Sequence, residues 1–210
     1  MLGVAVLVMA VAGVAFTNGA NANFKGVASL YGSGTATLKT ALLWGNAFTF
    51  AGSLFSFWIA SGLLKSFGGR GVLPDAIVQR PAFAASVALA AAGTSFLATR
   101  LAFPVSTTHA LTGAIAGCGL ATTILGSVSG KVQWNTMIVG FLFPLLVSPL
   151  IAIVIAWLFY KLLALASISL ESRSGLLDKL HFASAGAASF ARGLNDTPKM
   201  VAILLLIPEA

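Results

Sequence analysis

The sequence predicts an all-α, polytopic integral membrane protein, and its composition and uncharged runs support this class. Of the 210 residues, 58% are hydrophobic and 8% are charged, and the mean hydropathy is +0.98. A soluble domain carries about 25% charged residues. Crossing a bilayer takes roughly 20 apolar residues. Five runs of about that length or more contain no Lys, Arg, Asp or Glu. They are residues 1–24, 40–64, 81–99, 101–130 and 132–160.

The net charge of +7 is distributed as expected for a membrane protein. Basic residues lie mostly at the ends of the apolar runs. An excess of Lys and Arg in the cytoplasmic loops sets the orientation of membrane proteins. This distribution argues against a nucleic-acid partner and favours a lipid bilayer, in a prokaryotic plasma membrane. The first run lacks the basic start and cleavage site of a signal peptide, so we interpret it as a retained helix. The basic loop residues are Lys65, Arg70, Arg80, Lys161, Arg173 and Lys179.

The chain up to residue 126 predicts four helices and a short amphipathic piece. A helix to about residue 16 is followed by a polar break at Asn18–Asn23 and a short amphipathic piece to about residue 34. A helix over 38–64 precedes a glycine-rich loop. Helices over 82–102 and 107–126 flank a second break, P-V-S-T-T-H at 104–109, and Gly113 and Gly117 predict close packing of the latter helix.

The second half predicts one long helix and one interrupted helix. The long helix covers 134–165, and we expect Pro144 and Pro149 to kink it. A polar stretch then leads to a helix over about 180–192. A third break follows at Asn195–Thr197, before an apolar tail.

Two decapeptides indicate an internal repeat. F-T-N-G-A-N-A-N-F-K at 16–25 and F-A-R-G-L-N-D-T-P-K at 190–199 share Phe, Gly, Asn and Lys at a constant offset of 174 residues. We therefore predict a first transmembrane repeat over 1–165, a polar linker over 166–179, and the start of a truncated second repeat over 180–210. A second P-V-S-T-T-H motif at this offset would lie beyond residue 210.

The break at 104–109 has the chemistry of an oxyanion site. Pro104 disfavours helix before it, and three hydroxyls, those of Ser106, Thr107 and Thr108, follow at the start of the next helix. Free amides and hydroxyls at a helix N-terminus suit a tetrahedral anion. The alternative is an ordinary N-cap followed by helix-start threonines. His109 has no carboxylate in the same run to orient it, so we do not expect a hydrolase or any other enzyme, and we expect no cofactor.

The two decapeptides also carry potential ion ligands. Asp196 is the one acid flanked by apolar helix, which makes it a functional candidate, with a helix N-cap as the alternative. Amide and carboxylate oxygens suit a small cation. Lys25 and Lys199 occupy equivalent positions and could attract an anion or simply extend from a helix end to the interface.

These motifs resemble those of the inorganic phosphate transporter (PiT, or phosphate permease) family. The similarity runs through N-G-A-N-A-N-F-K-G-V-A, P-V-S-T-T-H-A and S-F-A-R-G-L-N-D-T-P-K. It implies inverted repeats, discontinuous helices and secondary-active import of inorganic phosphate, coupled to sodium or protons by alternating access. It also implies phosphate ligands and coupling-ion ligands, with Asn21 and Asp196 as sodium ligands. The implied phosphate ligands are Ser106, Thr107, Thr108, Asn195 and Thr197, and the implied coupling-ion ligands are Asn18, Asn21, Asn195 and Asp196.

Two departures from the family pattern leave alternatives open. Ala22 stands where the family has Asp, which removes a coupling-ion ligand, and the second P-V-S-T-T-H motif is absent. The chain could thus be an N-terminal fragment, a homodimer, or a non-transporting half that needs a partner chain. A sulfate permease of the same family is a further alternative. We expect Ala22→Asp to strengthen cation-dependent anion binding.

Overall fold

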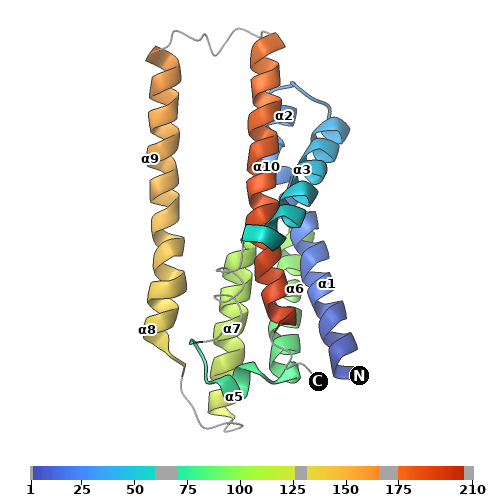
Figure 1. Ribbon diagram of the computed structural model, residues 1–210, viewed down its shortest axis with the longest axis vertical. Helices are drawn as coiled ribbons and strands as arrows, with labels where there is room; N and C mark the ends of the chain where they lie inside the picture. Colours follow the sequence, from blue (N-terminus) through green and yellow to red (C-terminus); the bar gives the residue numbers. More distant parts are fainter. Residues whose placement is uncertain (1, 60–70, 126–131, 166–174, 206–210) are drawn as a thin grey trace.

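The computed structural model describes residues 2–59, 71–125, 132–165 and 175–205, and the regular elements within these ranges are helices (Figure 1). Four stretches of these ranges are long and apolar enough to cross a membrane: Val4–Gly26, Leu38–Ile59, Pro81–Arg100 and Trp134–Leu165. The predicted all-α, polytopic membrane architecture is confirmed. The end of the predicted helix over 38–64, and the linker as far as residue 174, lie outside the described residues.

Among the described residues, a bundle of five helices forms the body of the protein. In it α1 (Leu2–Ala22) packs on α6 (Pro81–Arg100), and α6 packs on α7 (Thr107–Ile124). On the other side of α1, α10 (Gly175–Leu204) packs along α3 (Leu38–Ile59) and also touches α1. The short helices α2 (Ala28–Gly32) and α5 (Asp75–Val78) lie in the connections.

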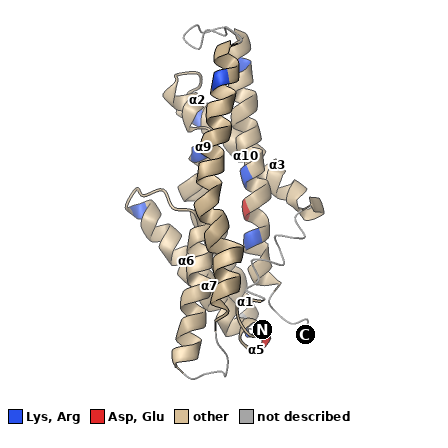
Figure 2. Cartoon of the chain, turned by 90° about the vertical axis from the view of Figure 1, so that its left-hand side faces the viewer, with Lys and Arg blue, Asp and Glu red and all other residues tan. Residues whose placement is uncertain are grey.

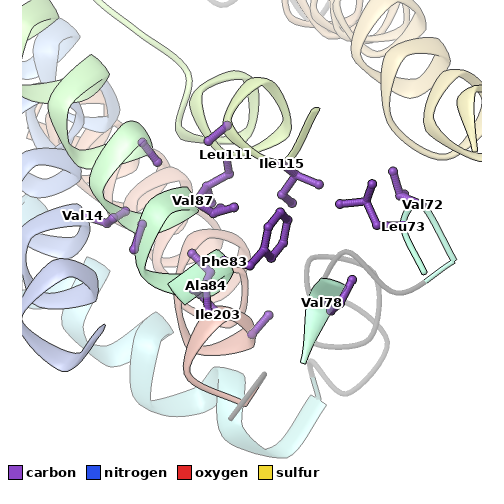
Figure 3. Close-up of a cluster of buried hydrophobic side chains, with 14 of the residues drawn as sticks. Val14, Val72, Leu73, Val78, Phe83, Ala84, Val87, Leu111, Ile115 and Ile203 are labelled. Atoms are coloured by element: carbon purple, nitrogen blue, oxygen red, sulfur yellow. The ribbon is translucent and has the colours of Figure 1, made fainter. Parts of the chain in front are cut away.

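The main hydrophobic core lies between α1, α6 and α7 (Figure 3). Its side chains are small and branched, so the helices approach closely, and burial of each larger apolar side chain contributes about 1.5–3 kcal/mol. Members from four helices include Val14, Val87, Leu111 and Ile203.

The predicted long helix over 134–165 is present but stands beside the bundle (Figure 1). It consists of α8 (Trp134–Met137), the π-turn η2 (Ile138–Leu142) and α9 (Phe143–Leu165). None of the residues of α9 is buried. Pro144 cannot donate a hydrogen bond back to Gly140, and the π-turn, in which Phe143 N–H bonds to the carbonyl oxygen of Ile138, lies just before this proline.

Two of the three predicted helix breaks are wrong. Helix α1 continues through Asn18 to Ala22, and only the 3-10 turn η1 (Asn23–Gly26) follows it. Helix α10 continues through Asn195–Thr197 and past Pro198. Polar side chains in these helices are satisfied by side chains of other helices, so the backbone does not have to unwind. The third break is present, between the end of α6 at Arg100 and the N-cap of α7 at Ser106.

Glycines set the closest helix crossing, but not the glycines that the sequence indicated. A Cβ atom on Gly193 would overlap the carbonyl oxygen of Thr49, and one on Gly52 would overlap that of Phe190. The α3–α10 crossing therefore requires both glycines. Around Gly113 and Gly117, in contrast, no described atom lies within 4 Å of the position that a Cβ atom would take. Among the described residues, no other helix makes the close approach that these two glycines would permit.

Candidate functional site

A cavity of about 440 Å³ opens between α1, α3 and α10, next to the two decapeptides. Its apolar wall comes mainly from α1 and the end of α10. Its polar wall includes three of the predicted site residues, Asn18, Asp196 and Thr197. Residues of both decapeptides therefore contribute to one cavity, although the two segments are far apart in the sequence.

Asp196 is the centre of the polar cluster. Its Oδ2 accepts a hydrogen bond from Asn18 Nδ2 at 3.3 Å and lies 3.4 Å from Arg192 Nε. Its Oδ1 lies 3.4 Å from Lys199 Nζ. Asp196 lies between Arg192 and Lys199 in the second half of α10, where Figure 2 shows a red band between two blue ones. Asp196 is thus an ion-pair partner inside a helix, not an N-cap.

The start of α7 joins this cluster through two threonines. Thr107 is buried and donates its hydroxyl hydrogen to Asn18 Oδ1. Lys199 donates to Thr108 Oγ1 at 2.8 Å, and its side chain is only 4% exposed. Lys199 therefore does not extend to the membrane interface; it ties α10 to the hydroxyl-rich end of α7.

Ser106 and Asn195 lie at the edge of this arrangement. Ser106 is the N-cap of α7, and its Oγ accepts the backbone N–H of His109 at 3.4 Å, the geometry of a capping residue. Both Ser106 and Asn195 are exposed, and neither lines the cavity. His109 is exposed as well.

Asn21 holds the connection between α6 and α7. Its Nδ2 donates to Thr99 Oγ1 at 3.2 Å and to the carbonyl oxygen of Phe103 at 2.9 Å. Its Oδ1 accepts from the backbone N–H of Val105 at 3.0 Å and from Lys25 Nζ at 3.3 Å. Asn21 and Asp196 therefore make separate sets of contacts, and it is Asn18 that reaches Asp196.

Three further residues, Arg192, Asn23 and Ser53, belong to the cluster; the sequence included Asn23 in the first polar break but assigned no role to Arg192 or Ser53. Arg192 Nη1 donates to Asn23 Oδ1 at 2.9 Å, and Thr197 donates to Ser53 Oγ at 2.8 Å. The offset of 174 residues could have found two of them, because it pairs Asn18 with Arg192 and Asn23 with Thr197. Ser53, in α3, lies outside both decapeptides and carried no such signal.

Positive charge exceeds negative charge around the cavity and the α7 N-terminus. Among the described residues, the charged groups at this junction are Lys25, Arg192, Lys199 and Asp196, so three bases face one acid, a formal charge of 3 − 1 = +2. A low-dielectric wall strengthens the field of such a cluster and attracts anions. The junction can therefore bind an anion by charge, hydroxyl groups and amides.

Together, the apolar helices and the internal polar cluster define a multi-pass membrane protein with a polar site inside its bundle. Residues 18–174 match the phosphate transporter family, and the chain belongs to that family. It is a multi-pass protein of the cell membrane.

Curated relatives agree with this assignment. The chain is 26% identical over 196 residues to a probable low-affinity inorganic phosphate transporter of Mycobacterium leprae, covering 91% of this chain and 44% of the relative. It is 28% identical over 155 residues to a putative phosphate permease of Pyrococcus horikoshii, covering 72% and 36%. A putative phosphate permease of Mycobacterium bovis is 31% identical over 158 residues, covering 70% and 27%. The chain thus spans less than half the length of these relatives. No solved structure gives a significant match.

Proposed function

We propose that this chain contributes the first repeat of a secondary-active transporter that imports inorganic phosphate by alternating access. The observation that supports the proposal most strongly is the excess of bases at the hydroxyl-rich start of α7. Lys199 reaches Thr108, and Lys25 reaches the carbonyl oxygen of Val105 at 2.8 Å, so two ammonium groups contact the segment that precedes and starts α7.

Each group in the cluster has a role in the proposed binding step. The Thr108 hydroxyl, whose oxygen accepts from Lys199, can donate its hydrogen to the tetrahedral anion, and the bases offset the anion's charge. Asp196 orients Arg192 and Lys199 while the site is empty. The proposed phosphate ligands are Thr108, together with Thr107 and Thr197 once their hydroxyl hydrogens leave Asn18 and Ser53 for the anion. Ser106 and Asn195 lie at the margin. In the proposed cycle, the repeats are inverted and move around this site.

A sodium ion held by Asn21 and Asp196 does not fit the residues present. Both carboxylate oxygens of Asp196 already contact donors or bases, and the amide oxygen of Asn21 accepts from Val105 and Lys25. Ala22 offers no side-chain oxygen. Of the two coupling cations that the sequence allowed, we therefore propose the proton.

The test is phosphate binding by the 210-residue chain, purified in lipid nanodiscs and measured by titration calorimetry. Thr108→Val removes the hydroxyl that accepts from Lys199, and we expect a loss of about tenfold in phosphate affinity. Thr123→Val, near the other end of the same helix, is the matched control and should change the affinity by less than about twofold.

Two outcomes would contradict the proposal. Absence of phosphate binding by the unmodified chain would exclude a phosphate site in these residues. Tighter binding of sulfate than of phosphate in the same calorimetric titration would favour the sulfate alternative. If binding is found, uptake of labelled phosphate into vesicles that contain the chain, driven by a proton gradient, tests the transport step.

A further inference from the structure

Lys25 occupies a set of oxygen ligands of the kind that otherwise hold a small metal cation. It lies in η1, directly after α1, and its Nζ is 2.8 Å from the carbonyl oxygen of Val105 and 3.3 Å from Asn21 Oδ1. Backbone carbonyl and side-chain amide oxygens are typical ligands of hard cations. In transporters with discontinuous helices, carbonyl oxygens of non-helical backbone coordinate the coupling ion.

The orientation of this oxygen set is fixed by the protein. Asn21 Nδ2 donates to Thr99 Oγ1 and to the carbonyl oxygen of Phe103, which leaves Oδ1 directed at Val105 and Lys25. The same segment, between α6 and α7, supplies the second oxygen ligand from Val105. The set is therefore built before any ligand arrives, and the ammonium group of Lys25 fills it.

The position of Lys25 connects this set to the proposed anion site. Val105 directly precedes Ser106, the N-cap of α7, so the ammonium group lies beside the start of that helix. An ammonium group has three N–H donors, and two are directed at the two oxygens named above. One N–H donor remains for a bound anion. Ala22, at the end of the preceding helix, supplies no negative charge to neutralise the ammonium group.

We propose that Lys25 is a built-in cation that takes the place of a sodium ion, so that phosphate binding to this chain does not require sodium. The lysine holds the oxygens that would coordinate sodium and presents its positive charge, with its remaining N–H, to the anion. This inference rests on the proposed phosphate site. It goes further than the proposed function by assigning the place of the sodium ion to one residue, Lys25, so that the phosphate site and the role of Lys25 can fail separately.

The experiment measures phosphate affinity of the 210-residue chain in nanodiscs, in sodium chloride and in choline chloride at equal ionic strength and pH. For the unmodified chain we expect the same affinity in both salts, within about twofold. Lys25→Gln removes the charge and frees the two oxygens. We expect this variant to lose about tenfold in affinity in choline chloride and to recover affinity when sodium is added. Lys25→Arg keeps the charge and should remain independent of sodium.

The controls and contrary outcomes separate this inference from the proposed function. Lys39→Gln changes an exposed lysine of α3 and should behave like the unmodified chain. A loss of about tenfold or more on replacing sodium in the unmodified chain would overturn the role of Lys25 but leave the phosphate site intact. A Lys25→Gln variant with the same phosphate affinity as the unmodified chain in both salts would overturn the role of Lys25 as well. Absence of phosphate binding in both salts would contradict the proposed function itself.

Discussion

At the scale of single residues, Asp196 determines whether the bases of α10 can be held inside the bundle. Its carboxylate faces Arg192 and Lys199, whose side chains are 16% and 4% exposed. Removing one member of a buried ion pair leaves the other charge without compensation, at a cost of about 3 kcal/mol. We therefore predict that Asp196→Asn lowers the free energy of unfolding by about that amount, measured by denaturant titration of the detergent-solubilised chain.

The matched control is Asp75→Asn, a change of an exposed acid in the first turn of α5. We expect the control to change the free energy of unfolding by about 0.5 kcal/mol or less. Equal effects of the two substitutions would show that Asp196 does not hold the cluster together.

Ala102 is strained at the end of α6, where the chain turns towards the proposed site. Its φ of 58° lies in the left-handed region, which disfavours residues with a Cβ atom. The backbone N–H of Phe103 bonds to the carbonyl oxygen of Ala98 at 2.8 Å, and that of Ala102 bonds to Thr99 at 3.2 Å, the pattern of a Schellman cap in which glycine is preferred.

Ala102→Gly should therefore raise the free energy of unfolding, by about 1 kcal/mol. The control is Ala90→Gly, an exposed position inside α6, where glycine should lower it by about 1 kcal/mol. Both are measured by the same denaturant titration. Destabilisation by both substitutions would contradict the role assigned to Ala102.

At the scale of helices, the crossing of α3 and α10 fixes the shape of the cavity. Thr49 and Ser53 from α3 face Gly193 and Thr197 from α10, and all four line the cavity. Because a Cβ atom at Gly193 would clash with the backbone of Thr49, Gly193→Ala must push the two helices apart. We predict a loss of about 3 kcal/mol in the free energy of unfolding, together with weaker phosphate binding.

Gly113→Ala is the matched control for this change. No described atom lies within 4 Å of the position of the added methyl group, and alanine is a better helix former than glycine. The control should be neutral or slightly stabilising. A larger loss from Gly113→Ala than from Gly193→Ala would mean that the small-residue pattern of α7, rather than the α3–α10 crossing, carries the close packing.

Sequence and structure agree for one kind of helix and differ for another. Helices with an uncharged apolar run could be located from the sequence, because run length and composition are local properties: both ends of α6 and the start of α3 were placed to within a few residues. Polar residues in α1 and α10 were interpreted as breaks, because their partners are not local: Asn18 meets Asp196 and Thr107, and Thr197 meets Ser53. Such pairings are absent from local sequence patterns, so the sequence indicated breaks where the structure has continuous helix.

At the scale of the whole molecule, the charged and the apolar surfaces are segregated. The acid and bases of α10 that surround the cavity are turned into the bundle, whereas α9 exposes large apolar side chains on all sides. Ile153 is 66% exposed and Trp157 is 58% exposed. Exposing such a helix to water would be unfavourable, so in the membrane the surface of α9 contacts lipid chains wherever no protein covers it.

This arrangement predicts different lipid access for two of the tryptophans. Trp157 lies on exposed α9, whereas Trp44 is partly buried on α3, and its Nε1 donates to the carbonyl oxygen of Phe182 at 2.9 Å. In variants that keep only one tryptophan, with the other three replaced by Phe, lipids with brominated acyl chains should quench the fluorescence of Trp157 more strongly than that of Trp44. The reverse order would show that α9 packs against protein in the membrane. Reconstitution in unbrominated lipid of the same chain length provides the reference intensity for each variant.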